Sequence, residues 1–308
     1  MRFPTNGLLV AINDYSFLEC SSLTGTVTIP SKVSYLGSGA FFDSAITALE
    51  MVEDGALEYI GDSSFSSCSS LTGTVTIPSK VSYVGSSAFE SSAITALDMV
   101  EDGALEYIGD SSFYFCSSLT GTVTIPSNVS YLGNYAFAYS AITALDMAED
   151  GALEYIGDYS FYSCYDLKGT VTIPSKVSYV GNYAFFGSAI TALDMADDGA
   201  LEYIGDYSFG EYPSLTGTVT IPSKVSYVGY YAFYGAPLSA INVLSSLLSS
   251  IESYAFGSST VSPCGYTSMY SDDGAPATLT VPSSLPSSVY QPVLYSCVLV
   301  VAPVITGN

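Results

Sequence analysis

The stretch L-T-G-T-V-T-I-P-S-K-V-S-Y-V-G-S-S-A-F, from Leu71 to Phe89, decides the fold of this 308-residue chain because close copies of it recur along the sequence. The phenylalanine that ends the stretch returns every 24 residues without a gap. Its copies are Phe17, Phe41, Phe65, Phe89, Phe113, Phe137, Phe161, Phe185, Phe209 and Phe233. A fixed period of this length predicts a solenoid, in which each short unit buries its apolar face against its neighbours.

Two kinds of coil alternate, so the complete period is 48 residues. The first kind has the sequence quoted above and begins at Leu23, Leu71, Leu119, Leu167 and Leu215. The second kind reads I-T-A-L-E-M-V-E-D-G-A-L-E-Y-I-G-D-x-S-F and begins at Ile46, Ile94, Ile142 and Ile190. We expect one short strand in each kind of coil.

The strand of the first kind of coil is expected at T-V-T-I, residues 26–29, where apolar and polar β-branched residues alternate. This alternation places Val27 and Ile29 inward and both threonines outward. In the following coil, Glu50 is expected to point outward beside Thr28. We expect these strands to stack as a parallel sheet. Gly37 and its copies, Gly61 through Gly229, are expected to permit a turn with positive φ.

The pattern resembles the BspA-like leucine-rich repeat family, whose units read L-x-x-I-x-I-P-x-x-V-x-x-I-G-x-x-A-F-x-x-C-x-x-L. The quoted stretch fits with one inserted residue near Gly73, and F-S-S-C-S-S-L at residues 65–71 supplies the last part. The second kind of coil departs from the pattern, because it has E-D-G and lacks Ile-Pro. The resemblance covers about residues 12 to 256. It implies a surface-exposed or secreted protein associated with adhesion, and it carries over no active site.

The expected fold is an α/β-type repeat solenoid, a leucine-rich-repeat superhelix of about eleven coils. It would have a short parallel β-sheet on one face and otherwise mostly β and irregular structure. We expect a short N-terminal edge segment at residues 1–11, the solenoid at residues 12–257, and a C-terminal cap or assembly segment at residues 258–308.

The composition of the chain excludes several classes of function. The chain has 6 Lys and Arg against 29 Asp and Glu, a net charge of -23, which repels nucleic acid and anionic lipid. It has no histidine, so a Ser-His-Asp triad and a histidine-ligated metal are excluded. We therefore expect no enzyme activity and no cofactor other than calcium, which is considered below.

The two ends of the chain differ. The first residues lack the pattern of a signal peptide. The apolar run at residues 289–305 is too short to span a bilayer and predicts core strands, and T-L-T-V-P at residues 278–282 resembles one more strand. One hypothesis is that the C-terminal segment docks on the bare N-terminal edge of the next molecule and builds filaments. The alternative is that truncation has removed an N-terminal coil.

The cysteines fall into two groups. Cys20, Cys68, Cys116 and Cys164 are 48 residues apart, so they would lie two coils apart, about 9.6 Å at strand spacing, beyond disulfide reach. We expect them to be free, buried thiols. Cys264 and Cys297 flank the irregular C-terminal segment and are candidates for a disulfide in an oxidising compartment.

The acidic residues are concentrated in the second kind of coil, where four copies of five acids account for twenty of the 29. Stacking arranges them in columns, and clustered oxygens are the ligands that calcium prefers. The weak calcium candidates are Glu53, Asp54, Glu101, Asp102, Glu149, Asp150, Asp197 and Asp198. The alternative is a solvated acidic face, because E-D-G lacks the spacing of a calcium loop.

Tyrosine forms two columns. The first has a member in every coil, from Tyr35 to Tyr227, and is expected to face outward and stack. The second occurs only in later coils, as Tyr135, Tyr159, Tyr183, Tyr207, Tyr231 and Tyr254. The equivalent positions of earlier coils hold Gly39, Ser63, Ser87 and Ser111. Since tyrosine is enriched at interface hot spots, the second column is a candidate interface, with neutral drift between repeats as the alternative.

The sequence thus predicts an extracellular or cell-surface structural or adhesive protein that binds other proteins, with a head-to-tail homopolymer as one form. The alternatives are a monomeric surface receptor for a protein or glycan, and an acidic calcium-dependent matrix protein. Asn128, in the sequon Asn-Val-Ser, is a candidate for N-glycosylation. We expect no transmembrane segment.

Overall fold

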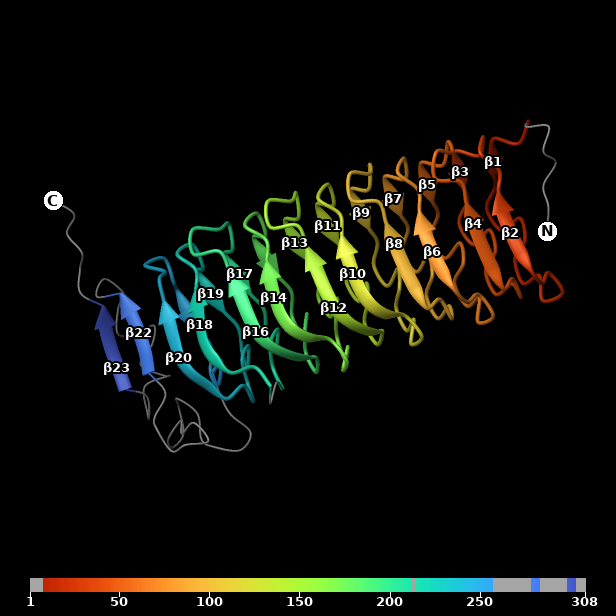
Figure 1. The fold of residues 1–308 in the computed structure, drawn as a ribbon. Helices are drawn as coiled ribbons and strands as arrows, with labels where there is room; N and C mark the ends of the chain where they lie inside the picture. Colours follow the sequence, from red (N-terminus) through yellow and green to blue (C-terminus); the bar gives the residue numbers. More distant parts are fainter. Residues whose placement is uncertain (1–7, 212–213, 257–277, 283–297, 303–308) are drawn as a thin grey trace. The chain divides into compact units, whose positions relative to one another are not determined.

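The structure is a computed structural model that describes residues 8–211, 214–256, 278–282 and 298–302 (Figure 1). These residues form strands and turns, and none of them lies in a helix, so the expected α/β character is wrong for the described part of the chain. The chain divides into two compact units, Met1–Leu167 and Lys168–Asn308, which are described separately below. No described helix is long and apolar enough to span a bilayer.

Each coil contains a two-residue strand, and in each unit these strands form a parallel sheet. In the first unit the sheet contains β1 (Ala11–Ile12), β3 (Tyr35–Leu36), β5 (Tyr59–Ile60), β7 (Tyr83–Val84), β9 (Tyr107–Ile108), β11 (Tyr131–Leu132) and β13 (Tyr155–Ile156). In the second unit it contains β15 (Tyr179–Val180), β17 (Tyr203–Ile204), β19 (Tyr227–Val228) and β21 (Ser250–Ile251). The described residues thus make about eleven coils, as expected.

A second, longer strand runs on another side of each coil. The first unit has β2 (Thr26–Ile29), β4 (Ala48–Met51), β6 (Thr74–Ile77), β8 (Ala96–Met99), β10 (Thr120–Ile125) and β12 (Ala141–Met147). The second unit has β14 (Lys168–Ile173), β16 (Ala189–Met195), β18 (Gly217–Ile221) and β20 (Leu238–Val243). They pair two by two, a first-kind coil with the following second-kind coil, as in β2-β4 and β6-β8.

The expectation of one strand per coil was therefore incomplete. The T-V-T-I strands expected to build one parallel sheet form separate small sheets of two to four strands, whereas the two-residue strands, most of them Tyr-Leu, Tyr-Ile or Tyr-Val, pair from each coil to the next within each unit. The orientation of the longer strands is confirmed. Val27 and Ile29 are buried, and Thr28 donates a hydrogen bond to Glu50 across the pair, Oγ1 to Oε2, at 2.8 Å.

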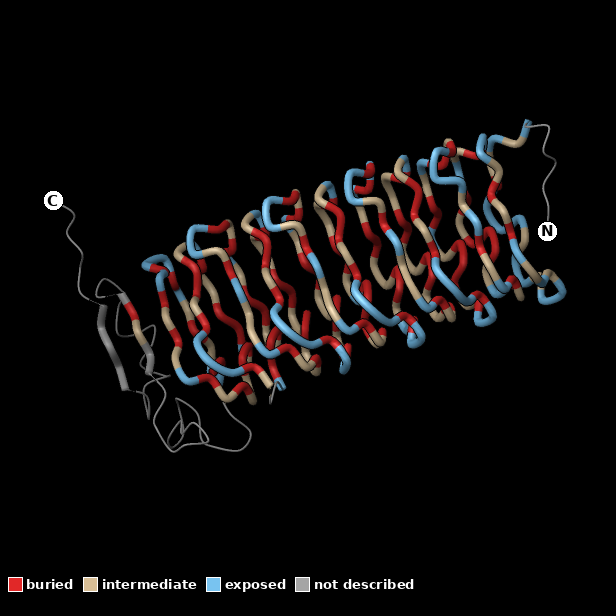
Figure 2. The backbone as a smooth tube through the Cα atoms, in the orientation of Figure 1, coloured by how far each residue is buried: buried red, intermediate tan, exposed pale blue. Residues whose placement is uncertain are grey.

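The core of each unit is a column of stacked phenylalanine rings with buried aliphatic side chains around it. Figure 2 shows where buried residues, in red, lie along each coil. In the first unit, the centroids of successive rings in the series from Phe17 to Phe161 are 4.9 to 5.6 Å apart. In the second unit, those from Phe185 to Phe256 are 5.2 to 5.4 Å apart. This column explains the invariant 24-residue period, because one ring fills the centre of each coil.

Gly37 and its copies are required for a reason other than the expected one. Their φ is not positive. Instead, a Cβ at Gly85 would lie 2.5 Å from the backbone nitrogen of Asp62 in the preceding coil, and one at Gly61 would lie 2.6 Å from the carbonyl carbon of Gly37. Glycine is therefore needed because successive backbones touch here. Positive φ occurs at other glycines, such as Gly73 at +85°.

Two further strands continue the second unit beyond the repeats. The sheet has the order β18-β20-β22-β23, with β22 at Thr278–Pro282 and β23 at Val298–Ala302, all parallel. The strand expected at residues 278–282 is thus confirmed, and the apolar run at residues 289–305 contributes a strand. The rest of the segment at residues 258–308 lies outside the described residues, as do Cys264 and Cys297.

Candidate interaction surface

The second tyrosine column lies at a turn where every coil has an unusual backbone. In the first unit this position holds Tyr15, Gly39, Ser63, Ser87, Ser111, Tyr135 and Tyr159, and each has a φ between 52° and 59°. The expectation that tyrosine takes this position only in later coils was therefore wrong at Tyr15. In the second unit the same position holds Tyr183, Tyr207, Tyr231 and Tyr254, with φ from 53° to 60°. The left-handed conformation costs a residue with a Cβ about 1–2 kcal/mol. The turn therefore recurs whether or not a tyrosine occupies it.

Backbone hydrogen bonds between coils hold this turn. The amide of Ser63 donates to the carbonyl of Ser86 at 2.8 Å, and the amide of Tyr135 donates to the carbonyl of Asp158 at 2.9 Å. Serine and tyrosine thus make the same main-chain contact. Since the main chain does not require the ring, the tyrosine side chain adds only what its own contacts supply.

The rings of the second column stack in each unit. The rings of Tyr135 and Tyr159 lie 4.6 Å apart at 3° in the first unit. In the second unit, the rings of Tyr183, Tyr207, Tyr231 and Tyr254 follow one another at 4.7 to 5.0 Å. A stacked pair contributes about 0.5–1.5 kcal/mol beyond area burial, so stacking offsets a backbone cost of similar size.

A second row of aromatic side chains joins the column in the first unit, and the sequence analysis did not identify it. Tyr114 meets Tyr135 and Tyr139 edge to face, with centroids 6.1 and 5.7 Å apart, and Phe115 lies 5.5 Å from Tyr139. Tyr162 lies 5.4 Å from both Tyr139 and Tyr159. We call Tyr114, Phe115, Tyr135, Tyr139, Tyr159 and Tyr162 the aromatic face of the first unit. Its sequence signal is the run Phe-Tyr-Phe at residues 113–115.

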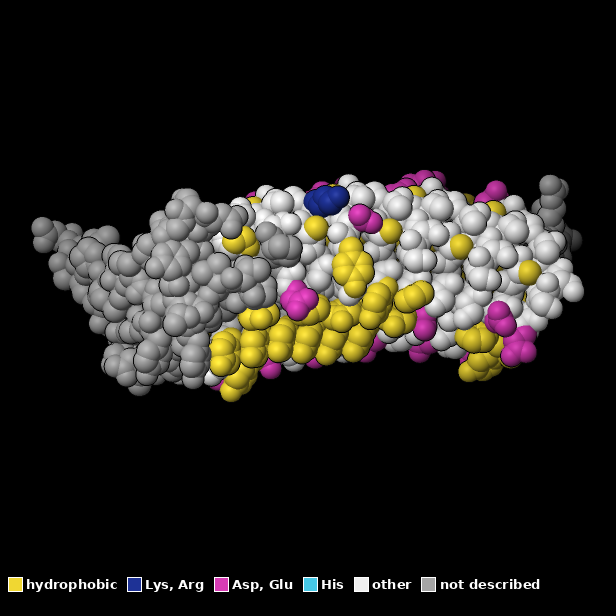
Figure 3. Space-filling view, turned by 90° about the horizontal axis from the view of Figure 1, so that it is seen from below, with side chains coloured by type: hydrophobic (Ala, Val, Ile, Leu, Met, Phe, Trp, Pro, Cys, Tyr) yellow, Lys and Arg dark blue, Asp and Glu magenta, His cyan; other side chains and the backbone are white. Residues whose placement is uncertain are grey.

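The second unit has a comparable set around its own column. Phe186 contacts Tyr183 and Tyr207 at 5.4 and 6.0 Å, and Tyr234 contacts Tyr231 edge to face at 5.0 Å. Figure 3 shows hydrophobic side chains, coloured yellow, in a closely packed row with acidic side chains in magenta beside it. The ring contacts given above make each aromatic set contiguous within its own unit.

The rings on the aromatic face are partly exposed and uncharged. Phe115 is 49% exposed and Tyr135 is 37% exposed. Burial against neighbouring rings raises the pKa of Tyr135, and the nearby Tyr114 and Asp158 raise it further. Burial is also the main cause that raises the pKa of Tyr159. The hydroxyl groups of both residues stay protonated at physiological pH, so the face combines apolar area with neutral hydrogen-bond donors.

The first tyrosine column serves the fold. Its rings stack from Tyr35 to Tyr155 in the first unit at 4.7 to 5.1 Å, as expected. The hydroxyl group of Tyr131 donates to Asp110 Oδ1 at 3.4 Å, and the same oxygen accepts the amide of Asn134 at 2.8 Å. Tyr35 is exposed and the rings from Tyr59 to Tyr155 are half-buried, and the carboxylate partners bridge successive coils.

The acidic turns are exposed and spread out. All eight calcium candidates are exposed. Nowhere in the described part of the chain do three or more acidic or cysteine side chains gather as a group that could hold a metal ion. Calcium binding by Glu53, Asp54 and their copies remains a prediction, and the geometry offers no preformed cage for it.

The four repeating cysteines are free thiols, as expected. Cys68, Cys116 and Cys164 are buried, but Cys20 is only half-buried. Each buried thiol donates to a backbone carbonyl, as Cys116 does to Phe89 at 3.2 Å, and contacts the serine of the preceding coil, as Cys116 does with Ser92 at 3.5 Å. These three buried thiols therefore contribute to the packing of the core.

The side-chain nitrogen of Asn128, the candidate for N-glycosylation, makes a hydrogen bond to the backbone of another coil. Nδ2 donates to the carbonyl of Gly103 at 2.7 Å. A glycan on this nitrogen would have to alter that hydrogen bond, and glycosylation of Asn128 stays a prediction.

The stacked coils, central phenylalanine column and parallel sheets define a leucine-rich-repeat type of β-solenoid. The family model "BspA type Leucine rich repeat region" matches residues 2–102, 53–168, 100–198 and 148–262. The chain therefore belongs to the BspA-type leucine-rich repeat family, as its sequence pattern had indicated.

Solved structures similar to this chain come from several bacteria. The pneumococcal vaccine antigen PcpA is 19% identical, with 91% of this chain and 79% of that chain covered and a TM-score of 0.44. A leucine-rich repeat protein from Bacteroides ovatus is 19% identical, with coverages of 96% and 88% and a TM-score of 0.40. A leucine rich cell surface protein from Faecalibacterium prausnitzii is 20% identical, with coverages of 99% and 87% and a TM-score of 0.44. A comparison with curated proteins found no match.

Proposed function

We propose that this chain is an extracellular or cell-surface protein with a structural or adhesive role, acting through protein–protein contacts made by its exposed aromatic side chains. The aromatic face of the first unit carries this proposal. Its six rings touch one another at 4.6 to 6.1 Å and stay partly exposed. Membership in the BspA-type family supports the location, because the resemblance implies surface-exposed or secreted proteins.

The favoured partner is a second copy of the chain. Tyrosine and phenylalanine concentrate at interface cores, where ring packing and excluded water dominate the binding energy. The aromatic face offers rings in both stacked and edge-to-face orientations, so a copy of the same surface could pack against it.

The ends of the chain favour a head-to-tail contact as a second element of assembly. Within the described residues, β2, the first of the longer strands, pairs only with β4, and β23 pairs only with β22. Each of these two strands therefore presents an unpaired edge, a template for another strand. A contact between β23 of one molecule and β2 of the next is heterologous and need not close, so it could build filaments.

Charge governs when assembly occurs. The net charge of -23 makes copies repel one another at low salt. Salt screens this repulsion over a Debye length of about 8 Å at physiological ionic strength, whereas contacts between rings are little affected. We therefore expect self-association to strengthen as salt is raised from low to physiological concentration.

Negative-stain electron microscopy of the purified protein, at low and moderate salt and with and without calcium, tests this proposal. Regular filaments or pairs that increase with salt would support it. Isolated particles under every condition would contradict self-assembly and favour the alternative of a monomeric receptor. Assembly that requires calcium would instead favour an acidic calcium-dependent matrix protein.

A further inference from the structure

A hollow opens in the first unit where the second tyrosine column is interrupted. It is lined by Tyr15, Leu18, Ser38, Gly39, Phe42, Asp62 and Ser63 and has a volume of about 350 Å3. Gly39 and Ser63 occupy the position that Tyr135 and Tyr159 occupy in later coils. The hollow is therefore space where later coils have a tyrosine ring.

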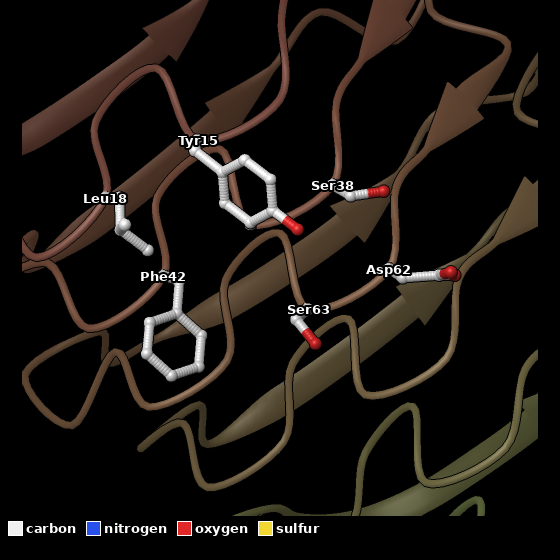
Figure 4. A pocket seen from close by; sticks show the side chains of 7 residues that line it. Tyr15, Leu18, Ser38, Phe42, Asp62 and Ser63 are labelled. Carbon is white, nitrogen blue, oxygen red and sulfur yellow. The ribbon is translucent and has the colours of Figure 1, made fainter.

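The hollow is lined by apolar side chains on one side and polar side chains on the other. In Figure 4 the ring of Tyr15 lies above that of Phe42, with Leu18 to the left of both rings and Ser38, Ser63 and Asp62 to their right. Tyr15 is 62% exposed and Leu18 is 41% exposed. One wall is thus apolar and the opposite wall is polar.

The polar wall retains hydrogen-bonding capacity. Asp62 Oδ1 accepts the amide of Ser86 at 2.9 Å, which fixes the carboxylate, and Oδ2 has no hydrogen-bond partner within the described residues. The hydroxyl groups of Ser38 and Ser63 likewise have none among those residues. Small-molecule sites commonly combine an apolar concave surface with a few fixed polar groups, in volumes of about 300–1,000 Å3.

We propose that this hollow binds a neutral pyranose ring, either a free sugar or one unit of a glycan. A pyranose presents C–H groups on its faces and hydroxyl groups around its edge. Its face would lie against Tyr15 or Phe42, and its hydroxyl groups would bond to Ser38, Asp62 and Ser63. The strongly negative charge of the chain disfavours an anionic sugar. The site is separate from the aromatic face and does not depend on self-association.

The repeat supplies matched variants that keep the fold. Ser63→Tyr introduces the side chain that Tyr159 has at the equivalent position four coils later. The φ of Tyr159 is 57° and that of Ser63 is 52°, so the turn accepts a tyrosine, and its ring would fill the hollow. Phe42→Ser removes one wall and installs the residue of the equivalent position in the next coil, Ser66. Ser87→Tyr makes the same exchange one coil beyond Ser63, outside the lining, and is the control.

Saturation-transfer NMR with the methyl glycosides of glucose, galactose, mannose and N-acetylglucosamine tests the proposal. At least one glycoside should receive saturation from the wild-type protein, and this signal should be lost in Ser63→Tyr, which fills the hollow, and in Phe42→Ser, which removes one of its walls. The signal should be retained in Ser87→Tyr. The proposal is overturned if no glycoside gives a signal, if Ser63→Tyr leaves the signal unchanged, or if N-acetyltyrosine amide binds there and the sugars do not.

Discussion

The rings of Tyr135 and Tyr159 lie parallel with their centroids 4.6 Å apart, although both residues have a positive φ, 56° and 57°. A bulky side chain at such a position gains little stability overall, because stacking only offsets the backbone cost. Earlier coils adopt the same turn with Ser63, Ser87 and Ser111. Tyr135 and Tyr159 are thus not required by the turn, which is why we propose that they contact a second copy of the chain.

A buried serine without a hydrogen-bond partner predicts a stabilising substitution. Ser112 is fully buried, and its hydroxyl group has no hydrogen-bond partner among the residues that the structure describes. An unsatisfied buried hydroxyl group costs about 1–3 kcal/mol, and the neighbouring coils hold Ala88 and Ala136 at this position. Ser112→Ala should raise the free energy of unfolding by about 1 kcal/mol in urea titrations.

Ser140→Ala is the matched control for this serine prediction. Ser140 is also buried, but its hydroxyl group contacts the thiol of Cys164 at 3.4 Å. This variant should lower the free energy of unfolding by about 1 kcal/mol. Equal losses in Ser112→Ala and Ser140→Ala would show that Ser112 has a partner after all.

Glycine is required for different reasons at two positions, for close contact between backbones at Gly85 and for a positive φ at Gly73. A Cβ at Gly85 would overlap the backbone of Asp62 and Gly61, whereas a Cβ at Gly73 would have nothing within 4 Å but would require φ near +85°. Gly85→Ala should cost about 3 kcal/mol or more, since rigid backbone must move. Gly73→Ala should cost about 1 kcal/mol from its conformation alone. Thermal unfolding measures both, and equal costs would refute this distinction.

The buried thiols should resist alkylation at alkaline pH. Burial raises the pKa of Cys116 and of Cys164 to about 12, although hydrogen bonds from Ser92 and Ser140 act in the opposite direction. At pH 9 the folded protein should therefore react with iodoacetamide at Cys20, which is half-buried, long before Cys116 or Cys164. Peptide mapping by mass spectrometry distinguishes the sites, and urea should remove the protection. Rapid native labelling of Cys116 would contradict the packing described above.

The first tyrosine column predicts a loss of stability at high pH. Burial, with the charge of Asp62 as the next cause, raises the pKa of Tyr83 to about 12. An unfolded tyrosine titrates near pH 10. The stabilising contribution is thus fully present below pH 10 and is lost as pH rises through about 12, because the unfolded state releases its proton first.

Urea unfolding between pH 8 and 11 measures this dependence on pH. Tyr83→Phe keeps the stacked ring but has no ionisable group, so its free energy of unfolding should fall less steeply with pH than that of the wild type. Parallel slopes would mean that Tyr83 ionises as readily in the folded state as in the unfolded state.

Local patterns were enough to predict much of the fold. The 24-residue spacing of phenylalanine gave the number of coils, and the alternation around Val27 gave the inward face, because both depend on neighbours in sequence. The reason for Gly85 could not be predicted, since its close contact is with Asp62 in another coil. The two-residue strands at Tyr59 and its copies were missed because a dipeptide is too short to show a period.

The candidate sites were predictable only in part. The column of Tyr135 and Tyr159 was visible as a repeat, but stacking was expected only for the first tyrosine column. The joining of Tyr114, Phe115 and Tyr139 to that column depends on how side chains turn between coils. The hollow beside Phe42 is defined by an absent ring, which a sequence pattern for core residues does not record.

Sedimentation velocity over a concentration series at physiological salt tests the central claim most directly. The wild type should form larger species as concentration rises, and Tyr135→Ser/Tyr159→Ser should stay monomeric while keeping the wild-type circular dichroism spectrum. Glu101→Gln/Asp102→Asn, which alters exposed acids outside the aromatic face, should associate at least as well as the wild type. Equal association of the wild type and the tyrosine variant, or none by either, would contradict the claim that the aromatic face binds a second copy.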